Sequence, residues 1–367
     1  MLGKAITILS LILLPFANAA PQVIENPDKP QSKTAGRVIE LKEVLKITDE
    51  QGEFYFKYPR SPKIGPDGSI FVQDTEQVLQ FDKQGKLIRN YFKKGQGPGE
   101  MSYAIVVLPY AQGLCIQASG PGKLVWFDGQ GKLLKERPVR PSGRMSLNLQ
   151  AFFGDTYYFS GSEFPRVAGE PQYIENPNSI FAMKDGSEEL RPLQSFPVKQ
   201  FAITSGGGGG MISIGPFLAV PFQSKYLIVV HTCEYLIKLL DPKSNAVVRT
   251  FNRKYARVES PPIKPEDNKP MMMINGKTYS RPPQKYLNDI SAVYTGKNAI
   301  WIVTSTKDPK KRVLIDVFNA EGAYTDSFYL PVPPEGQFVI TDEYCLTVEK
   351  NPDETYAVKK YEFVWKN

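Results

Sequence analysis

The sequence predicts an all-β protein built from repeated antiparallel strand units, and three observations support this. First, short strands separated by turns follow one another without intervening helices, which is typical of a meander. Second, 31 of the 367 residues are Pro, about 8% against an average of roughly 5%. Because interior Pro breaks helices, this composition argues against a helix bundle. Third, one strand–turn unit recurs along the chain.

The clearest unit lies in residues 63–101. It opens with the turn Pro66-Asp67-Gly68, where Gly accepts a positive φ. Strands are expected at residues 69–73, 78–81 and 86–92, with a turn at 82–85 between the last two. Three short strands in succession make an antiparallel meander and not a βαβ unit.

Weaker copies of this unit follow, each marked by a turn after a strand. The markers fall at residues 82, 128, 185, 241 and 319, and a further copy occupies residues 344–365. Repeats of about 40–50 residues with several strands each are the signature of propeller blades. The sequence therefore predicts a six-bladed β-propeller of four-stranded antiparallel blades.

The last unit is one strand short, and an N-terminal segment can supply it. Residues 36–50 place Ile39, Leu41, Leu45 and Ile47 in near-alternation. The segment also fits a helical period, but its β-branched content and the missing strand favour a strand. Pairing the first and last segments closes the ring and removes a free sheet edge.

These motifs carry a family resemblance. The chain resembles the six-bladed β-propellers related to NHL repeats through DGSIFVQD at 67–74, VLQFDKQGK at 78–86 and GQGPGE at 95–100. The resemblance spans about residues 36–366 and implies the propeller fold and an exported bacterial protein. It implies no reaction. The Gly-rich stretch lacks GK[ST], so it is interpreted as an inter-blade crossover and not as a phosphate loop.

Residues 1–19 have the pattern of a secretory signal peptide. Lys4 precedes an apolar run at 5–16, and Ala17-Asn18-Ala19 forms a small-x-small cleavage pattern. We therefore expect an exported protein, periplasmic or extracellular, with no transmembrane segment. Residues 20–35 are expected to be flexible and residues 36–367 to form a single propeller domain, with an insertion at about 256–284. A monomer is expected.

Composition excludes several classes of site. The single His excludes sites built on two or three imidazoles, such as HExxH proteases. Cys115, Cys233 and Cys345 never form CxxC, and their even spacing places them in different blades, so three free, mostly buried thiols are expected. The net charge of +7 is spread along the chain, which argues against nucleic-acid binding.

Polar residues at strand ends near the channel mouth are the candidate ligand-binding residues. They are Gln73, Asp74, Gln117, His231, Thr304 and Glu349. His231 suits a general base or a ligand contact, although a lone His is more often structural, and Asp74 is also typical of a residue that caps its own turn. No catalytic residue or metal ligand is assigned.

The resemblance adds an alternative, because related propeller lactonases hold a divalent cation with Glu, Asn and Asp. A calcium or magnesium ion in the central channel would suit such hard oxygen ligands. No other cofactor is expected. A ring of strand-end polar groups also suits a sugar or peptide, so the metal site stays an alternative.

Two further segments are candidates for contact with a partner. Met271, Met272 and Met273 lie in the insertion, and Met-rich surfaces adapt to partners. Gly206–Gly210 forms either a flexible loop or a flap over the channel. Together these observations predict an exported binding protein without a catalytic signature, which recognises a protein, glycan or small molecule through one propeller face. The alternative is a metal-assisted hydrolase or lactonase at the channel mouth.

Overall fold

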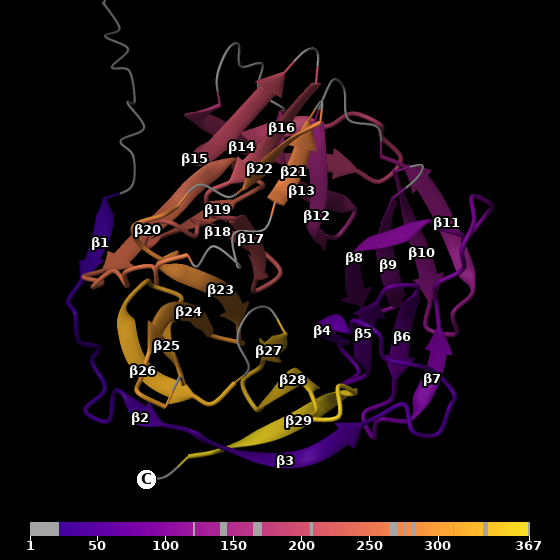
Figure 1. Cartoon of the computed structure of the whole chain (residues 1–367), viewed down its shortest axis with the longest axis horizontal. Helices are drawn as coiled ribbons and strands as arrows, with labels where there is room; N and C mark the ends of the chain where they lie inside the picture. Colours follow the sequence, from indigo (N-terminus) through magenta and orange to yellow (C-terminus); the bar gives the residue numbers. More distant parts are fainter. Residues whose placement is uncertain are drawn as a thin grey trace, which may run out of the picture.

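The computed structural model forms a ring of six small sheets (Figure 1). The residues that it describes are 22–119, 122–139, 145–163, 171–205, 208–263, 270–274, 276–280, 283–310, 312–332 and 337–365. All regular elements within these ranges are strands. The fold is a six-bladed β-propeller, as the repeat predicts. The expected signal peptide lies outside the described residues.

The first three blades follow one another along the chain. Blade 1 consists of β4 (Arg60–Ile64), β5 (Ile70–Asp74), β6 (Gln77–Phe81) and β7 (Leu87–Asn90). Blade 2 consists of β8 (Tyr103–Tyr110), β9 (Gly113–Ser119), β10 (Lys123–Asp128) and β11 (Leu133–Pro138). Blade 3 consists of β12 (Met145–Phe153), β13 (Thr156–Glu163), β14 (Gln172–Lys184), β15 (Arg191–Ser205) and β16 (Gly208–Ser213).

The other three blades each include a strand from the N-terminal segment. Blade 4 consists of β17 (Phe217–Phe222), β18 (Tyr226–His231), β19 (Leu236–Asp241), β20 (Ala246–Arg253) and β1 (Val23–Asn26). Blade 5 consists of β23 (Ile290–Thr295), β24 (Ala299–Lys307), β25 (Val313–Asn319), β26 (Tyr324–Leu330) and β2 (Arg37–Val38). Blade 6 consists of β27 (Phe338–Ile340), β28 (Tyr344–Lys350), β29 (Tyr356–Val364) and β3 (Glu40–Ile47).

Two turn markers of the repeat, those of blades 1 and 2, share one hydrogen-bonding pattern. Asp82 Oδ1 accepts the backbone N–H groups of Gln84 and Lys86, both at 2.9 Å, and Asp128 Oδ1 binds the matching pair in blade 2. Gly85 follows with φ at 84°, a conformation that favours Gly. In blades 1 and 2 the Asp and Gly of the marker therefore fold the hairpin between the third and fourth strands.

The N-terminal segment runs around the outside of three blades. β3 pairs antiparallel with β29, which confirms the predicted closure of the ring. β1 and β2 pair in parallel with β20 and β26 and add a fifth strand to two blades, a feature absent from the predicted four-stranded pattern. Within residues 20–35, which the sequence suggests are flexible, the Asn26 amide donates to the carbonyls of Asn252 and Gly322 at 2.8 and 2.9 Å. These hydrogen bonds hold that part of the chain against blades 4 and 5.

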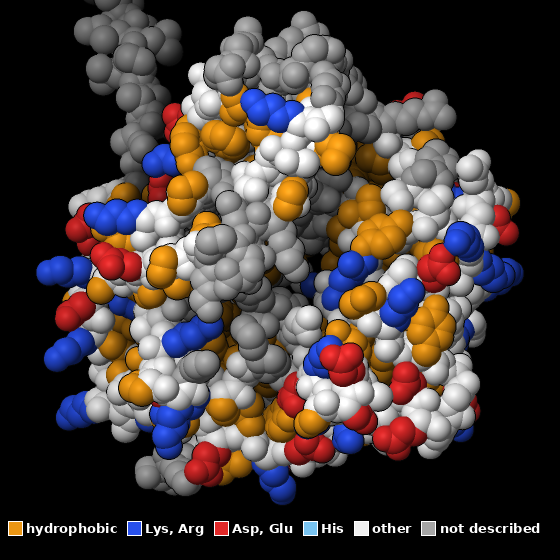
Figure 2. Space-filling model, viewed as in Figure 1, with side chains coloured by type: hydrophobic (Ala, Val, Ile, Leu, Met, Phe, Trp, Pro, Cys, Tyr) orange, Lys and Arg blue, Asp and Glu red, His pale blue; other side chains and the backbone are white. Residues whose placement is uncertain are grey.

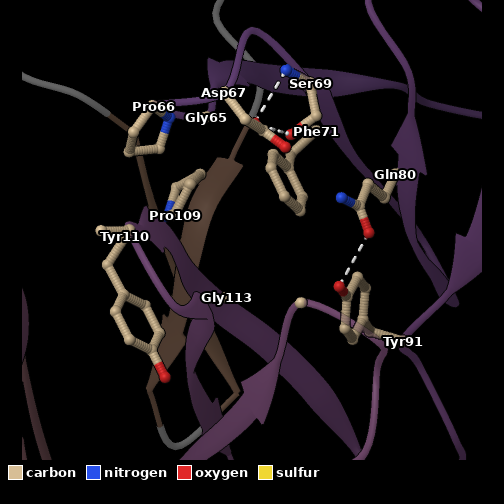
Figure 3. A pocket seen from close by; sticks show the side chains of 12 residues that line it. Gly65, Pro66, Asp67, Ser69, Phe71, Gln80, Tyr91, Pro109, Tyr110 and Gly113 are labelled. Atoms are coloured by element: carbon tan, nitrogen blue, oxygen red, sulfur yellow. Dashed lines mark hydrogen bonds between the residues drawn. The ribbon is translucent and has the colours of Figure 1, made fainter.

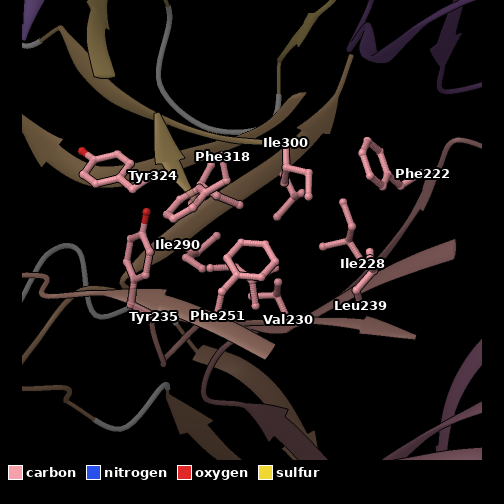
Figure 4. Close-up of a cluster of buried hydrophobic side chains, with 13 residues drawn as sticks. Phe222, Ile228, Val230, Tyr235, Leu239, Phe251, Ile290, Ile300, Phe318 and Tyr324 are labelled. Carbon is pink, nitrogen blue, oxygen red and sulfur yellow. The ribbon is translucent and has the colours of Figure 1, made fainter. Parts of the chain in front are cut away.

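Apolar side chains pack between neighbouring blades. Figure 4 shows the cluster between blades 4 and 5, which includes Phe222, Phe251 and Phe318, all essentially inaccessible to solvent. Burying one such side chain stabilises the fold by about 1.5–3 kcal/mol. Since each blade contributes both of its faces to such clusters, no blade could bury its apolar residues alone.

Strand order defines two faces of the ring. Because strands alternate in direction, the crossovers between blades and the turns between second and third strands all lie on one face, called here the crossover face. The crossover face carries residues 48–59, 91–102 and the insertion. The opposite face, with the turns between first and second strands, is called the hairpin face.

The insertion of residues 256–284 contains a two-stranded hairpin, β21 (Pro270–Ile274) and β22 (Lys277–Ser280). Ile274 packs with Ile203 and Ile212 of blade 3, so the hairpin sits on the extended end of that blade. Gly208–Gly210, within the predicted glycine flap, belong to β16 and pair with β15, while Gly206 and Gly207 lie outside the described residues.

Candidate functional site

The six predicted ligand-binding residues all lie on second strands of their blades, near the crossover face. Gln73 and Asp74 end β5, Gln117 is in β9, His231 ends β18, Thr304 is in β24 and Glu349 is in β28. The structure therefore places them on one face and in five different blades. Their side chains, however, mostly engage the protein itself.

Gln73 and Gln117 connect neighbouring blades. The Gln73 amide donates to the carbonyl of Ala104 in blade 2. The Gln117 amide donates to the Leu147 carbonyl at 2.7 Å and accepts the Leu149 N–H at 2.7 Å, so it completes two backbone hydrogen bonds of blade 3. Both glutamine side chains are buried, which makes them inter-blade ties.

Asp74 shapes the crossover loop at 48–59. Its two carboxylate oxygens accept the backbone N–H groups of Lys57 and Tyr58 at 2.7 and 2.8 Å. The loop is held further by the Gln77 amide, which donates to the Tyr55 carbonyl at 2.6 Å. The buried Asp74 thus caps a loop that displays two tyrosines on the crossover face.

Glu349 lies in a polar cluster of blade 6. Its carboxylate accepts hydrogen bonds from Thr347 and Tyr361, both at 2.8 Å, and pairs with Lys359 at 2.9 Å. Burial pushes the pKa of Glu349 upward, but the hydrogen bonds from Lys359, Thr347 and Tyr361 outweigh it and lower the pKa below its usual value. Protein donors thus occupy most of the lone pairs of the Glu349 and Asp74 carboxylates.

Thr304 and His231 differ in whether their side-chain polar atoms have hydrogen-bond partners. Thr304 is buried and donates to the Leu314 carbonyl at 3.1 Å. His231 is half-buried, and within the described part of the chain its shielded Nε2 has no hydrogen-bond partner. Burial lowers the pKa of His231, which favours the neutral imidazole. Of the six predicted residues, His231 keeps the most free hydrogen-bonding capacity.

Exposed apolar side chains gather on the crossover face, and the sequence reasoning missed most of them. Tyr58 is 63% exposed and Met273 is 70% exposed. The other exposed apolar side chains on this face are Tyr55, Tyr103, Ile105, Tyr173 and Ile263. Figure 2 shows the face, with hydrophobic and basic side chains together over the region of β4 and β8. Met271 and Met272 are strand residues of β21 whose side chains are not described.

Two basic residues of β4 were also not predicted from the sequence. The Arg60 guanidinium lies over the Tyr103 ring, 5.0 Å from its centroid. Lys63 is exposed and has no ion-pair partner in the described ranges. A hint was present in the sequence, since Ser61-Pro62 interrupts the strand and Pro in a strand marks a bulge or an edge.

Hollows occur on both faces. A cavity of about 370 Å³ lies between blades 2 and 3 on the crossover face and is lined in part by Gln117, Lys123 and Asn148. A wider one of about 690 Å³ lies at the base of the insertion, between residues 259–263 and 283–287. On the hairpin face a cavity of about 80 Å³ lies between blades 1 and 2 (Figure 3). There the Tyr91 hydroxyl donates a hydrogen bond to Gln80 at 2.8 Å, so these two polar side chains of the lining are paired with each other.

The described residues were searched for metal-binding clusters, membrane-spanning helices and free thiols. No group of three or more His, Cys, Asp or Glu side chains among them is arranged to hold a metal ion. No helix in those ranges is long and apolar enough to span a membrane. All three cysteines are free, with Cys115 and Cys345 buried and Cys233 half-buried, which confirms that prediction.

Solved structures share the fold at low sequence identity. A protein of Bacteroides fragilis NCTC 9343 named as a candidate exported protein matches with a TM-score of 0.56 and 13% identity, covering 94% of this chain and 100% of that chain. A gluconolactonase from Xanthomonas campestris matches with a TM-score of 0.45 and 10% identity, covering 95% of this chain and 99% of that chain. No family model and no curated protein matches the chain. These likenesses concern the fold, and the relation to NHL repeats stays a prediction.

Proposed function

We propose that this protein is an exported binding protein that recognises a ligand or protein partner on the crossover face. One observation carries the proposal: exposed tyrosines cluster there on a loop that buried polar residues hold in place. Tyr58 is exposed while its backbone N–H is fixed by Asp74 at 2.8 Å. Rigid aromatic side chains supply large contact area at low entropic cost, which is the property of binding surfaces.

Export is supported by the signal-peptide pattern of residues 1–19 and by the name of the Bacteroides fragilis protein of similar fold. The insertion widens the same face, with Met273 exposed on its hairpin. Binding on this face does not require any of the six strand-end residues to change the hydrogen bonds described above.

The test compares aromatic variants with a matched control. The mature protein is immobilised and exposed to a panel of neutral and acidic glycans and to solubilised envelope proteins. Tyr58→Ala and Tyr103→Ala should abolish retention of whatever the wild type binds. Leu134→Ala, which removes a side chain 53% exposed on the outer strand β11, should not. Binding that survives both tyrosine changes but not the Leu134 change would place the site elsewhere and refute the proposal.

A further inference from the structure

The feature that carries a further inference is a pair of basic side chains on β4, the inner strand of blade 1. Arg60 lies opposite Gln73 on β5, whereas Lys63 lies opposite Phe71, so the register shifts between them. Ser61 within the shift has φ at 48°, which is unusual for a residue other than Gly. The chain holds a bulge there, and bulges redirect side chains.

The bulge turns both basic residues to the same side of the sheet. Residues directly opposite each other on antiparallel strands point to the same side. Gln73 binds the Ala104 carbonyl of blade 2, and Phe71 packs in the cluster between blades 1 and 2. Arg60 and Lys63 therefore both face β8, at the inside of the ring, although three residues of regular strand would have placed them on opposite sides.

Arg60 has an unmet hydrogen-bonding requirement. Its guanidinium stacks on Tyr103, and its Nη2 is shielded from solvent with no hydrogen-bond partner in the described part of the protein. A shielded donor without a partner is costly, and more so when it is charged. The planar guanidinium is suited to bidentate binding of a carboxylate or phosphate.

Lys63 adds a second positive charge, and it has no ion-pair partner among the residues that the structure describes. It is reached by solvent, yet the surrounding protein lowers its pKa, and burial is the one cause of that change. Both properties fit a lysine on the inner strand β4 that solvent reaches while protein surrounds its ammonium group. An incoming anion would restore the stability of its charged form.

We infer that the inside of the ring between β4 and β8 binds the anionic group, a carboxylate or phosphate, of a ligand that enters from the crossover face. Arg60 and Lys63 bind the anion, and Tyr103 and Tyr58 contact the remainder of the ligand. Tyr58 is two residues from Arg60, and Tyr103 already lies under its guanidinium. The inference rests on the proposed binding function and adds the chemical class of the ligand.

Isothermal titration calorimetry at low salt tests it with three probes: D-glucuronate, inorganic phosphate and neutral D-glucose. The wild type should bind one or both anions and not glucose. Arg60→Met and Lys63→Met should each weaken that binding by roughly 10- to 100-fold, as expected for loss of a hydrogen bond to a charged group. Lys86→Met, which changes an exposed lysine in the hairpin-face turn of the same blade, should leave it unchanged.

A second measurement does not depend on the variants folding. Lysines of the wild type are methylated with ¹³C-formaldehyde and the Lys63 signal is titrated with and without the bound anion, which should raise its pKa. Absence of binding by both anions, equal binding by wild type and the two variants, or an unchanged Lys63 titration would overturn the inference. If the wild type still retains a partner that Tyr58→Ala does not retain, the proposed binding function stands and only the inference that the ligand is anionic fails.

Discussion

Removal of the Asp316 carboxylate should destabilise this protein more than any other single change to an ion pair. Asp316 is fully buried between blades 4 and 5 and pairs with Arg253 Nε at 2.7 Å. Tyr235 and Tyr324 donate their hydroxyl groups to the same carboxylate at 2.5 and 2.6 Å. Arg253 in turn lies against the rings of Tyr235, Tyr255 and Tyr324.

The magnitude follows from what Asp316→Ala would leave behind. The Arg253 side chain is 7% exposed, so its charge would be buried without the carboxylate that pairs with it. Breaking a buried pair in this way costs about 3–5 kcal/mol of the free energy of unfolding. The two tyrosine hydroxyls would also lose their acceptor. Urea unfolding followed by tryptophan fluorescence measures the loss, and Trp301 of blade 5 is a suitable reporter.

Asp326→Ala is the matched control. Asp326 also belongs to blade 5 and pairs with an arginine, Arg37, at 2.8 Å, but both side chains are 23% exposed. Its loss should cost about 1 kcal/mol or less. A double variant, Asp316→Leu with Arg253→Met, should be less destabilised than Asp316→Ala, because no charge is left unpaired. The reasoning is refuted if Asp316→Ala costs no more than Asp326→Ala.

Four other outcomes are expected. Gln117→Ala should lower the free energy of unfolding by about 2–4 kcal/mol in the same urea assay, because two buried backbone groups lose their hydrogen-bond partner. A variant that is as stable as the wild type but has lost ligand binding would show instead that Gln117 contacts the ligand. Burial, with the nearby Asp316, raises the pKa of Tyr324 above its ordinary value of 10.0, so the stability it contributes is complete below about pH 10 and falls above it, where the unfolded chain ionises first. The melting temperature of Tyr324→Phe should therefore fall less steeply than that of the wild type in this range. A thiol reagent should find three free thiols in the unfolded, unreduced protein but only Cys233 in the native one, because Cys115 and Cys345 are buried and Cys233 is half-buried. Reaction of one thiol alone after unfolding would contradict the blade assignment. Elemental analysis of protein purified without chelator should find no stoichiometric calcium or magnesium, because the Asp74 and Glu349 carboxylates already accept hydrogen bonds from the protein. A bound ion that is lost in Glu349→Gln would favour the hydrolase alternative.

Local patterns were enough to predict the blades. In blades 1 and 2 the Asp and Gly of the turn marker act within a few residues, as Asp82 shows by binding the N–H groups of Gln84 and Lys86. Ring closure was predictable because the last unit lacked a strand and residues 36–50 could provide one. The parallel strand β1 was not, because a four-residue strand pairing with residues more than 220 positions away leaves no periodic signal.

The candidate site was predicted only in part. The strand-end residues lie near one face, but polarity alone could not distinguish a ligand contact from an inter-blade tie such as Gln117. Asp74 was recognised as a possible turn cap, and the structure shows that the loop it caps lies 16 and 17 residues earlier in the chain. The sequence does not single out Arg60 and Lys63, because their common direction depends on a bulge.

The sequence by itself determined the all-β class, the repeat and the number of blades, since turn chemistry and strand patterning act over short distances. It also determined the exclusions that follow from one His and three separated Cys. The tertiary structure alone decided which polar groups are already satisfied and which, like the Arg60 Nη2, are not. The physical reason is that hydrogen bonding and burial depend on contacts between blades, which join residues far apart in the sequence.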